Sequence, residues 1–348
     1  MRLTLLVPEL FWPEPADQTA YSALALPGLE WLLARGKPGR TPARPAETAL
    51  AAGFGLDEAA PFGPLRLLGE SFTAYGPNPR EGHWLCADPV HLRFHHERIV
   101  LADAGAFDLS DDEAHALAIG LNREFADIGE FHVATARRWY LRLEQPLAAE
   151  ARPLSAVAGR SLDRGAAAPG SKLQKWLNEI QMFLHGHPVN ARREAAGQPA
   201  VNSLWLWGSG ALPGGAAPPG GPAFAAVWAD APLARGLARW AGAPLEAAPA
   251  GLEELLRTAP RGDHLVVLDA LLPPVLYEDA AGWRAAVQRL DADWFVPLRR
   301  HLGRNPMALT LVAPTVFGLL TWQWTGAGRW KFWLSSRPLT DLARELAA

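Results

Sequence analysis

The chain has 348 residues, enough to bury one large hydrophobic core or two modest ones. Its formal net charge of −3 excludes the strong basic field on which general nucleic-acid binding depends, so we expect no duplex nucleic acid as a partner. The single cysteine, Cys86, excludes an internal disulfide framework, and no unbroken apolar run reaches the roughly 20 residues of a membrane span, so we expect a cytoplasmic protein with no membrane partner.

Residues 1–75 predict the first part of an α/β core. An apolar run at 3–7 predicts a strand, and leucines at helical spacing predict a helix over 27–35. The stretch 37–64 is rich in Ala, Pro and Gly, with one short helical piece at 46–52. We expect it to be a surface connection that contributes little to the core.

Residues 76–160 predict an inserted α+β cap subdomain. Ser110 and Glu113 form a capping-box pattern at the start of an amphipathic helix over 110–128. Predicted strands flank this helix at 85–94, 98–103 and 137–143. Because helices and strands alternate again after this segment, it interrupts the larger core.

Residues 161–348 predict the remainder of the α/β core. The expected helices lie at 172–184, 191–196, 233–240, 252–257 and 279–298. The expected strands lie at 201–207, 224–228, 265–268 and 308–312, and a C-terminal hairpin is expected over 318–334, followed by a helix. Such alternation is typical of a mainly parallel sheet covered by helices.

Polar side chains are concentrated around the strand at 201–207. His187, Asn190, Arg193 and Asn202 precede Trp207, and an imidazole, two amides and a guanidinium can together hold an anion without a metal. These five residues predict a pocket for a small phosphorylated or anionic ligand. The alternative is a polar network that caps the helix and anchors the Trp-rich strand.

Two histidine pairs raise the question of a metal. His185 and His187 form an H-x-H pair, and His95 and His96 are adjacent, but no third ligand stands at a suitable spacing near either pair. We therefore expect no metal and no cofactor.

The DPVH run could pair Asp88 with His91 for acid and base chemistry. The reading that we favour is structural: an Asp before a proline begins a turn, and the histidine packs on a sheet.

Tryptophans recur at strand spacing near the C-terminus, at Trp322, Trp324, Trp330 and Trp333. Core packing explains most such groups. The alternation of Trp322 and Trp324 with polar residues still leaves one aromatic face that requires a cover, so a protein partner could bind this Trp-rich region.

The HPVN run at 187–190, with Arg193, Gly197 and the VNSLWLWGSG stretch at 201–210, resembles the archaeal-type cofactor-independent phosphoglycerate mutases of the alkaline phosphatase superfamily. The DPVHL and HPVN runs resemble most closely a degenerate bacterial subgroup of uncharacterised or regulatory proteins. The resemblance implies an α/β alkaline phosphatase-like fold, with a mainly parallel sheet sandwiched by helices and an inserted α+β cap.

The resemblance also implies two divalent metals, and here the chain departs from the family. The family's Asp-Gly after the first strand is replaced by Val7-Pro8-Glu9-Leu10. No histidine follows the strand at 265–268 before residue 284, and 309–320 contains no ionisable side chain where the family places an Asp-His pair. No catalytic residue can be assigned from these positions.

These departures predict a catalytically degenerate mutase-like protein, more a pseudoenzyme than an enzyme, with a binding or regulatory role and a remnant anion pocket. The alternative is an active phosphoglycerate mutase or a metal-dependent phosphatase-like hydrolase of phosphoric esters. Such an enzyme would use non-standard metal ligands such as Glu9, Asp17, Asp269 or Asp279.

Overall fold

The computed structural model describes residues 1–71, 76–95, 98–147, 151–159, 161–162, 171–212, 223–305, 307–325 and 334–348. The chain divides into two compact units, one formed by Met1–Gly55 with Ala217–Ala348 and the other by Leu56–Ala216. The second unit therefore interrupts the first in the sequence, and it spans more residues than the cap predicted over 76–160. The second unit also includes the helices and the strand that follow residue 171. This strand, at Ser203–Gly210, pairs with the strand at His83–His95 of the same unit.

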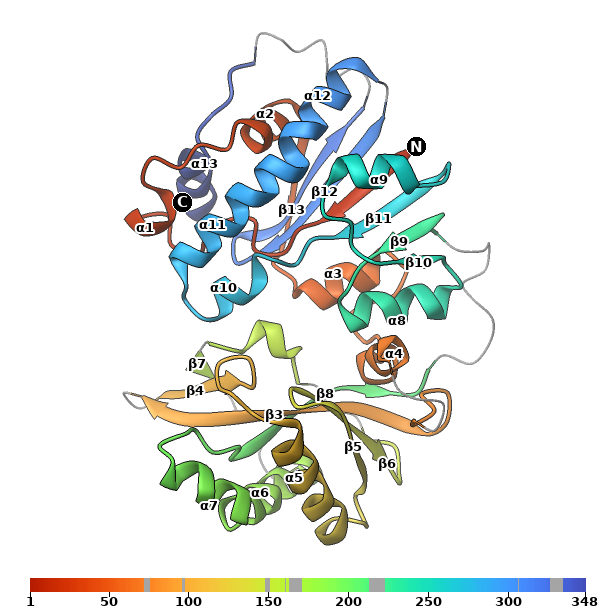
Figure 1. Ribbon diagram of the computed structural model, residues 1–348, viewed down its shortest axis with the longest axis vertical. Coiled ribbons are helices and arrows are strands. Elements are labelled where there is room, and N and C mark those ends of the chain that lie inside the picture. Colours follow the sequence, from red (N-terminus) through yellow and green to blue (C-terminus); the bar gives the residue numbers. More distant parts are fainter. Residues whose placement is uncertain are drawn as a thin grey trace. The chain divides into compact units, whose positions relative to one another are not determined.

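The first unit is built on a seven-stranded sheet (Figure 1). Its strands, in spatial order, are β10 (Leu245–Glu246), β9 (Ala226–Trp228), β11 (Asp263–Val267), β1 (Arg2–Leu6), β12 (Ala308–Thr315), β13 (Gly318–Trp324) and β2 (Lys37–Thr41). The five strands from β10 to β12 are parallel, whereas β13 and β2 add antiparallel pairs at one edge. The predicted mainly parallel sheet is confirmed, although Lys37–Thr41 is an edge strand and not part of a loose connection.

Helices cover this sheet (Figure 1). They are α1 (Gln18–Tyr21), α2 (Pro27–Arg35), α3 (Ala46–Ala52), α8 (Pro232–Ala241), α9 (Leu252–Thr258), α10 (Leu272–Leu276), α11 (Ala280–Leu290), α12 (Val296–Arg304) and α13 (Leu339–Ala347). The single helix predicted over 279–298 is instead α11 and α12 joined by a π-helical turn at Asp291–Phe295. Insertions of this type often mark a special role for a residue in the turn.

The C-terminal hairpin differs from the prediction. Strand β13 turns back on β12 in register from Leu309↔Trp324 to Thr315↔Gly318, so the apolar stretch 309–320 contains two strands and a turn. The second arm of the predicted hairpin, with Trp330 and Trp333, lies outside the described residues.

The aromatic face of β13 is covered within its own unit. The rings of Trp31 and Trp324 stack at 4.8 Å, and the Trp324 indole donates to the Leu32 carbonyl at 3.1 Å. Trp322 lies beside Phe11, with ring centroids 6.2 Å apart. The cover that these two tryptophans require is therefore α2 and the chain after β1.

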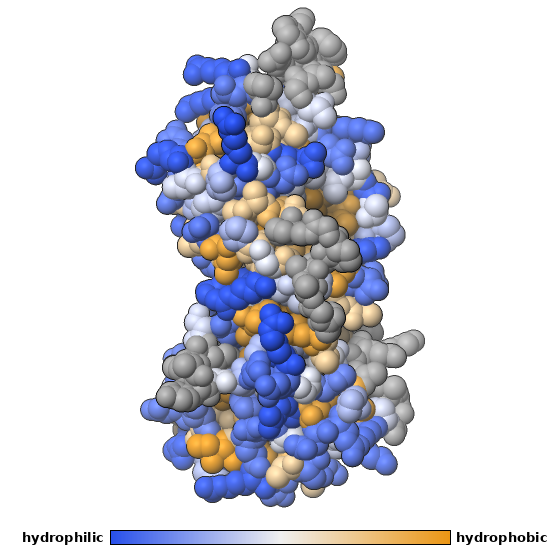
Figure 2. All heavy atoms as spheres, turned by 90° about the vertical axis from the view of Figure 1, so that its right-hand side faces the viewer, coloured by the Kyte–Doolittle hydropathy of each residue, from blue (hydrophilic) through white to orange (hydrophobic). Residues whose placement is uncertain are grey.

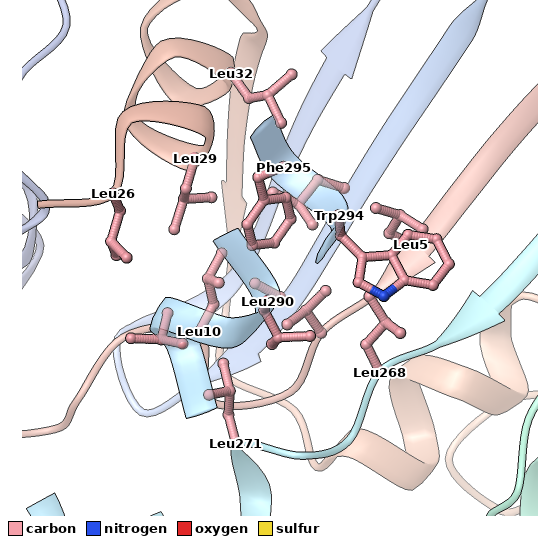
Figure 3. Packing of buried hydrophobic residues seen from close by; sticks show 14 of the residues in the cluster. Leu5, Leu10, Leu26, Leu29, Leu32, Leu268, Leu271, Leu290, Trp294 and Phe295 are labelled. Atoms are coloured by element: carbon pink, nitrogen blue, oxygen red, sulfur yellow. The ribbon is translucent and has the colours of Figure 1, made fainter. Parts of the chain in front are cut away.

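The core of the first unit joins the two ends of the sequence. Leu10, from the segment after β1, lies among Leu29 of α2, Leu271 and Phe295 (Figure 3). Leu10, Leu271 and Phe295 are fully buried. Burial of such side chains is worth about 1.5–3 kcal/mol each, so this contact holds both halves of the unit together.

The second unit contains a six-stranded sheet. Its main path runs β5 (Gly129–Thr135), β6 (Arg138–Leu143), β3 (His83–His95), β4 (Arg98–Asp103) and β7 (Ser161–Leu162), and β8 (Ser203–Gly210) pairs antiparallel with β3. Its helices are α4 (Phe62–Gly69), α5 (Asp111–Glu124), α6 (Lys172–His185) and α7 (Pro188–Ala195). The predicted capping box is confirmed at α5, where the Glu113 N–H donates to Ser110 Oγ at 3.2 Å and the Ser110 N–H donates back to the Glu113 carboxylate at 3.0 Å.

Strand β8 is covered on both faces (Figure 1). Leu204 and Leu206 pack into the cluster formed with α5 and α6. Trp207 points to the opposite side, where its ring lies 6.0 Å from that of Phe62 in α4. Because successive side chains of a strand face opposite ways, this alternation separates the polar groups near β8 into two environments.

Hydrophilic residues predominate on the molecular face shown in Figure 2, with smaller hydrophobic areas between them. Within the described part of the chain, no helix combines the length and apolar character needed to cross a membrane.

Candidate functional site

His187 begins a helix and does not merely follow one. Pro188 occupies the first turn of α7, and His187 Nδ1 accepts the Val189 N–H at 3.3 Å. Burial lowers the pKa of His187, and the charge of Arg192 lowers it further, which favours the neutral imidazole that this hydrogen bond requires. The HPVN run is therefore the amino-terminal cap and first turn of α7, which begins at Pro188 and not at residue 191 as the sequence predicted.

Asn190 and Asn202 each join two chain segments. The Asn190 amide, buried within the unit, donates to the Leu184 and Val201 carbonyls at 2.7 and 2.8 Å and accepts the Val201 N–H at 2.9 Å. Asn202 accepts the Leu92 N–H and donates to the Leu92 carbonyl, both at 2.8 Å. These contacts are those of the structural alternative, a polar network that anchors the start of β8.

Arg193 is 1% exposed and holds three partners. It donates to the carbonyls of Pro199 and Asp108 at 2.8 and 2.6 Å, and to the Glu113 carboxylate at 2.8 Å. Burial raises the pKa of Glu113, but the Ser110 N–H and the Arg193 guanidinium outweigh that effect, so the pKa lies below its ordinary value. The Glu113 carboxylate therefore binds the Arg193 guanidinium in the way that an anionic ligand would.

Trp207 does not lie with the other four predicted residues. Its indole donates to Asp88 Oδ2 at 2.9 Å, on the face of β8 that α4 covers. The structure thus brings His187, Asn190 and Arg193 together on α7 and separates Trp207 from them. Ligand binding by the five residues stays a prediction.

A buried ionic network on the α4 face was not predicted from the sequence. Arg66 of α4 donates to both Asp88 carboxylate oxygens, at 2.8 and 2.7 Å, and to the Tyr140 hydroxyl at 2.9 Å. The Tyr140 hydroxyl donates to Glu70, which also pairs with Arg138 at 2.7 Å. Burial raises the pKa of Tyr140, so its hydroxyl stays protonated and can donate.

The place of Asp88 in β3 corrects the expectation of a turn. Asp88 lies opposite Trp205 within the β3–β8 ladder and is 1% exposed. His91 Nδ1 contacts the Ala200 carbonyl at 2.8 Å. His91 is thus hydrogen bonded to the segment before β8, and the proline that follows Asp88 does not end the strand.

The segment after β1 is fixed in the core of the first unit. Val7, Leu10 and Phe11 are 0% exposed. Glu9 adopts a left-handed backbone with φ +55°, its N–H donates to the Pro314 carbonyl, and its own carbonyl accepts the Trp283 indole N–H at 2.9 Å. A non-glycine residue in this conformation is strained, and it persists only where its surroundings hold it.

The other acidic candidates have distinct environments. Asp17 caps α1 through the Thr19 N–H at 2.7 Å, and Asp279 caps α11 through the Gly282 N–H at 2.8 Å. Burial raises the pKa of Asp269, which follows β11, and the nearby charge of Asp230, which follows β9, raises it further. Across the described ranges, no three His, Cys, Asp or Glu side chains gather closely enough to hold a metal ion.

Comparison with known proteins places this scaffold among its relatives. The 2,3-bisphosphoglycerate-independent phosphoglycerate mutase of Methanosarcina barkeri is 26% identical over 235 residues, covering 61% of this chain and 56% of that enzyme. This chain shares weak homology with the cofactor-independent phosphoglycerate mutases. The Methanosarcina mazei mutase is also 26% identical, over 213 residues, covering 57% of this chain and 51% of that enzyme. The relationship predicted from the HPVN region is confirmed.

The chain spans about half the length of the curated relatives it matches. No protein-family model matches it. Its fold is shared with the PH0037 protein from Pyrococcus horikoshii, with a TM-score of 0.54 and 15% identity, covering 93% of this chain and 87% of that one.

Proposed function

We propose that this chain is a catalytically degenerate relative of the phosphoglycerate mutases that keeps their scaffold for a binding or regulatory role. The observation that carries the proposal is the segment after β1. The resemblance places a metal-binding Asp there, whereas Val7, Leu10 and Phe11 fill this segment with buried apolar side chains.

Two-metal phosphoryl transfer requires several oxygen and nitrogen ligands that converge on both ions, because the metals stabilise the entering and the leaving oxygen. Of the residues from Val7 to Trp12, only Glu9 is ionisable, and its backbone is hydrogen bonded on both sides. Asp17 and Asp279 each satisfy the first turn of a helix, so recruiting either as a ligand would cost about 1 kcal/mol of capping energy. The described residues therefore do not fit a two-metal centre.

One observation favours the alternative of an active enzyme. Asp230 and Asp269 follow neighbouring parallel strands and are close enough for the charge of one to raise the pKa of the other. The carboxyl ends of parallel strands are where α/β proteins bind ligands. A cation would relieve the repulsion between these two carboxylates.

Assay of purified protein for interconversion of 2- and 3-phosphoglycerate, with manganese or magnesium added, separates the two functions. Metal content by mass spectrometry is the second readout. We expect neither turnover nor stoichiometric metal. Turnover that is lost in Asp269→Asn but kept in Asp263→Asn, a change at the opposite end of β11, would overturn the proposal.

The proposed binding role includes an anionic ligand at His187, Asn190, Arg193 and Asn202. Such a ligand must displace Glu113 from the Arg193 guanidinium. Phosphate should therefore raise the melting temperature of Glu113→Gln more than that of the unaltered protein. The matched control is Glu124→Gln, an exposed change at the other end of α5. An equal response of all three proteins would support the structural network alone.

A further inference from the structure

One stripe of α5, exposed except at Ala116, which is half-buried beside the core cluster, carries a charge pattern that complements itself. Asp112, Ala116, Ile119 and Arg123 follow each other at intervals of four, three and four residues, which places them along one face of the helix. Ile119 is 54% exposed, and Asp112 and Arg123 are exposed at the two ends of the stripe. The stripe is therefore acidic at its start, apolar in the middle and basic at its end.

Asp112 and Arg123 lie in the first and last turns of α5, where their charges favour the helix dipole. In the part of the chain that the structure describes, Asp112 and Arg123 form no ion pair, whereas their neighbour Glu113 is paired with Arg193. Helix α6 of the same unit carries Met182, which is 77% exposed. Ile119 and Met182 are two of the few large apolar side chains that reach water in the described chain.

We propose that this stripe is a self-association surface, on which α5 of a second copy packs antiparallel about a two-fold axis. With the axis level with the midpoint between Ala116 and Ile119, Asp112 of each copy faces Arg123 of the other. Ala116 then lies against Ile119, so the small side chain of one copy receives the large one of the other. A two-fold interface requires this kind of self-complementary patch.

The charge pattern selects a second copy over an unrelated partner. The two-fold axis repeats each contact, so a pair of α5 helices forms two ion pairs and two apolar contacts. Each helix has 14 residues and is about 21 Å long. One helix pair buries little surface by the standard of stable complexes, so the association is weak and reaches half-saturation at micromolar concentrations or above.

Sedimentation velocity of the full chain over about ten to several hundred micromolar measures the association. Asp112→Arg places like charges together at both ends of the interface, and so does Arg123→Asp. Each should weaken association roughly tenfold or more. Glu253→Arg is the matched control, because it makes the same charge change at the second position of another helix, α9.

Mixing the two reversed variants tests the register directly. In a mixed pair, Arg at position 112 of one copy faces Asp at position 123 of the other, and the unaltered ends face correctly as well. We expect the mixture to associate about as strongly as the unaltered protein, and high salt to weaken it. A monomer at every concentration, association that neither reversal changes, or a mixture that fails to recover would each overturn the proposal. Circular dichroism of each variant establishes that the loss is not unfolding.

Discussion

The Asp291 carboxylate accepts a 2.7 Å hydrogen bond from the Leu29 N–H, although 262 residues separate the two in the chain. The same carboxylate accepts the Gly28 N–H at 3.3 Å. Helix α2 has no side-chain cap of its own, and Asp291 supplies one from the π-helical turn between α11 and α12. The first turn of one helix is thus stabilised by the irregular turn of another.

Removal of this cap should destabilise the first unit. Asp291→Ala leaves two buried N–H groups without an acceptor, each of which costs about 1–3 kcal/mol, and we expect roughly 3 kcal/mol in all. Asp291→Asn keeps one acceptor oxygen and should lose about 1 kcal/mol. Urea unfolding measures both, with Asp293→Ala on the exposed side of the same turn as control. Equal loss in Asp291→Ala and the control would contradict the capping role.

Gly28 permits the approach of the turn to α2. A Cβ at Gly28 would lie 2.3 Å from Val296 N and 2.4 Å from the Phe295 carbonyl carbon, and backbone atoms cannot yield as a side chain can. Gly28→Ala should therefore cost about 3 kcal/mol or more. Gly303→Ala, within α12 and with no neighbour inside 4 Å, should stabilise by about 0.5–1 kcal/mol. The two melting temperatures should move in opposite directions.

Local signals predicted the helices, because their causes lie within a few residues. The leucines of α2 and the capping box of α5 are such signals, and both helices begin where the sequence placed them, although α5 ends at Glu124 and not at residue 128. The start of α7 was missed although Pro188 marks it, since proline is favoured at the first helical position.

The pairing of strands from distant segments could not be predicted from local sequence signals. Strand β8 was expected, but its partner β3 lies more than 100 residues earlier, so its assignment to the second sheet depends on tertiary contacts. Lys37–Thr41 is polar, contains Pro38 and Gly39, and is exposed throughout, and it is a strand only because β13 offers an edge. At the candidate site, the residue types predicted hydrogen bonding, but not that Glu113 would be the partner of Arg193.

The Glu113–Arg193 pair predicts a pH dependence. The pKa of Glu113 is lower in the folded chain than its ordinary value of 4.5, so the unfolded chain takes up a proton first as pH falls. The stability that this pair contributes is present above pH 4.5 and is lost as pH falls through the folded pKa. Glu113→Gln, which leaves the buried Arg193 charge without a carboxylate, should cost about 3 kcal/mol at pH 7. The difference between Glu113→Gln and the unaltered protein should shrink in acid, and a difference independent of pH would contradict this account.

The Arg66–Asp88 pair predicts strong coupling in the second unit. Arg66→Met strands a buried carboxylate and Asp88→Asn strands a buried guanidinium, so each change should cost about 3–5 kcal/mol. The double variant removes both charges while the asparagine still accepts a hydrogen bond from Trp207, so its cost should be well below the sum of the single costs. A double-mutant cycle by urea unfolding measures the coupling. The control cycle uses the exposed pair Arg142–Glu130, for which we expect a coupling free energy of about 0.2–1 kcal/mol. Comparable coupling in the two cycles would show that burial of the Arg66–Asp88 pair does not determine its coupling free energy.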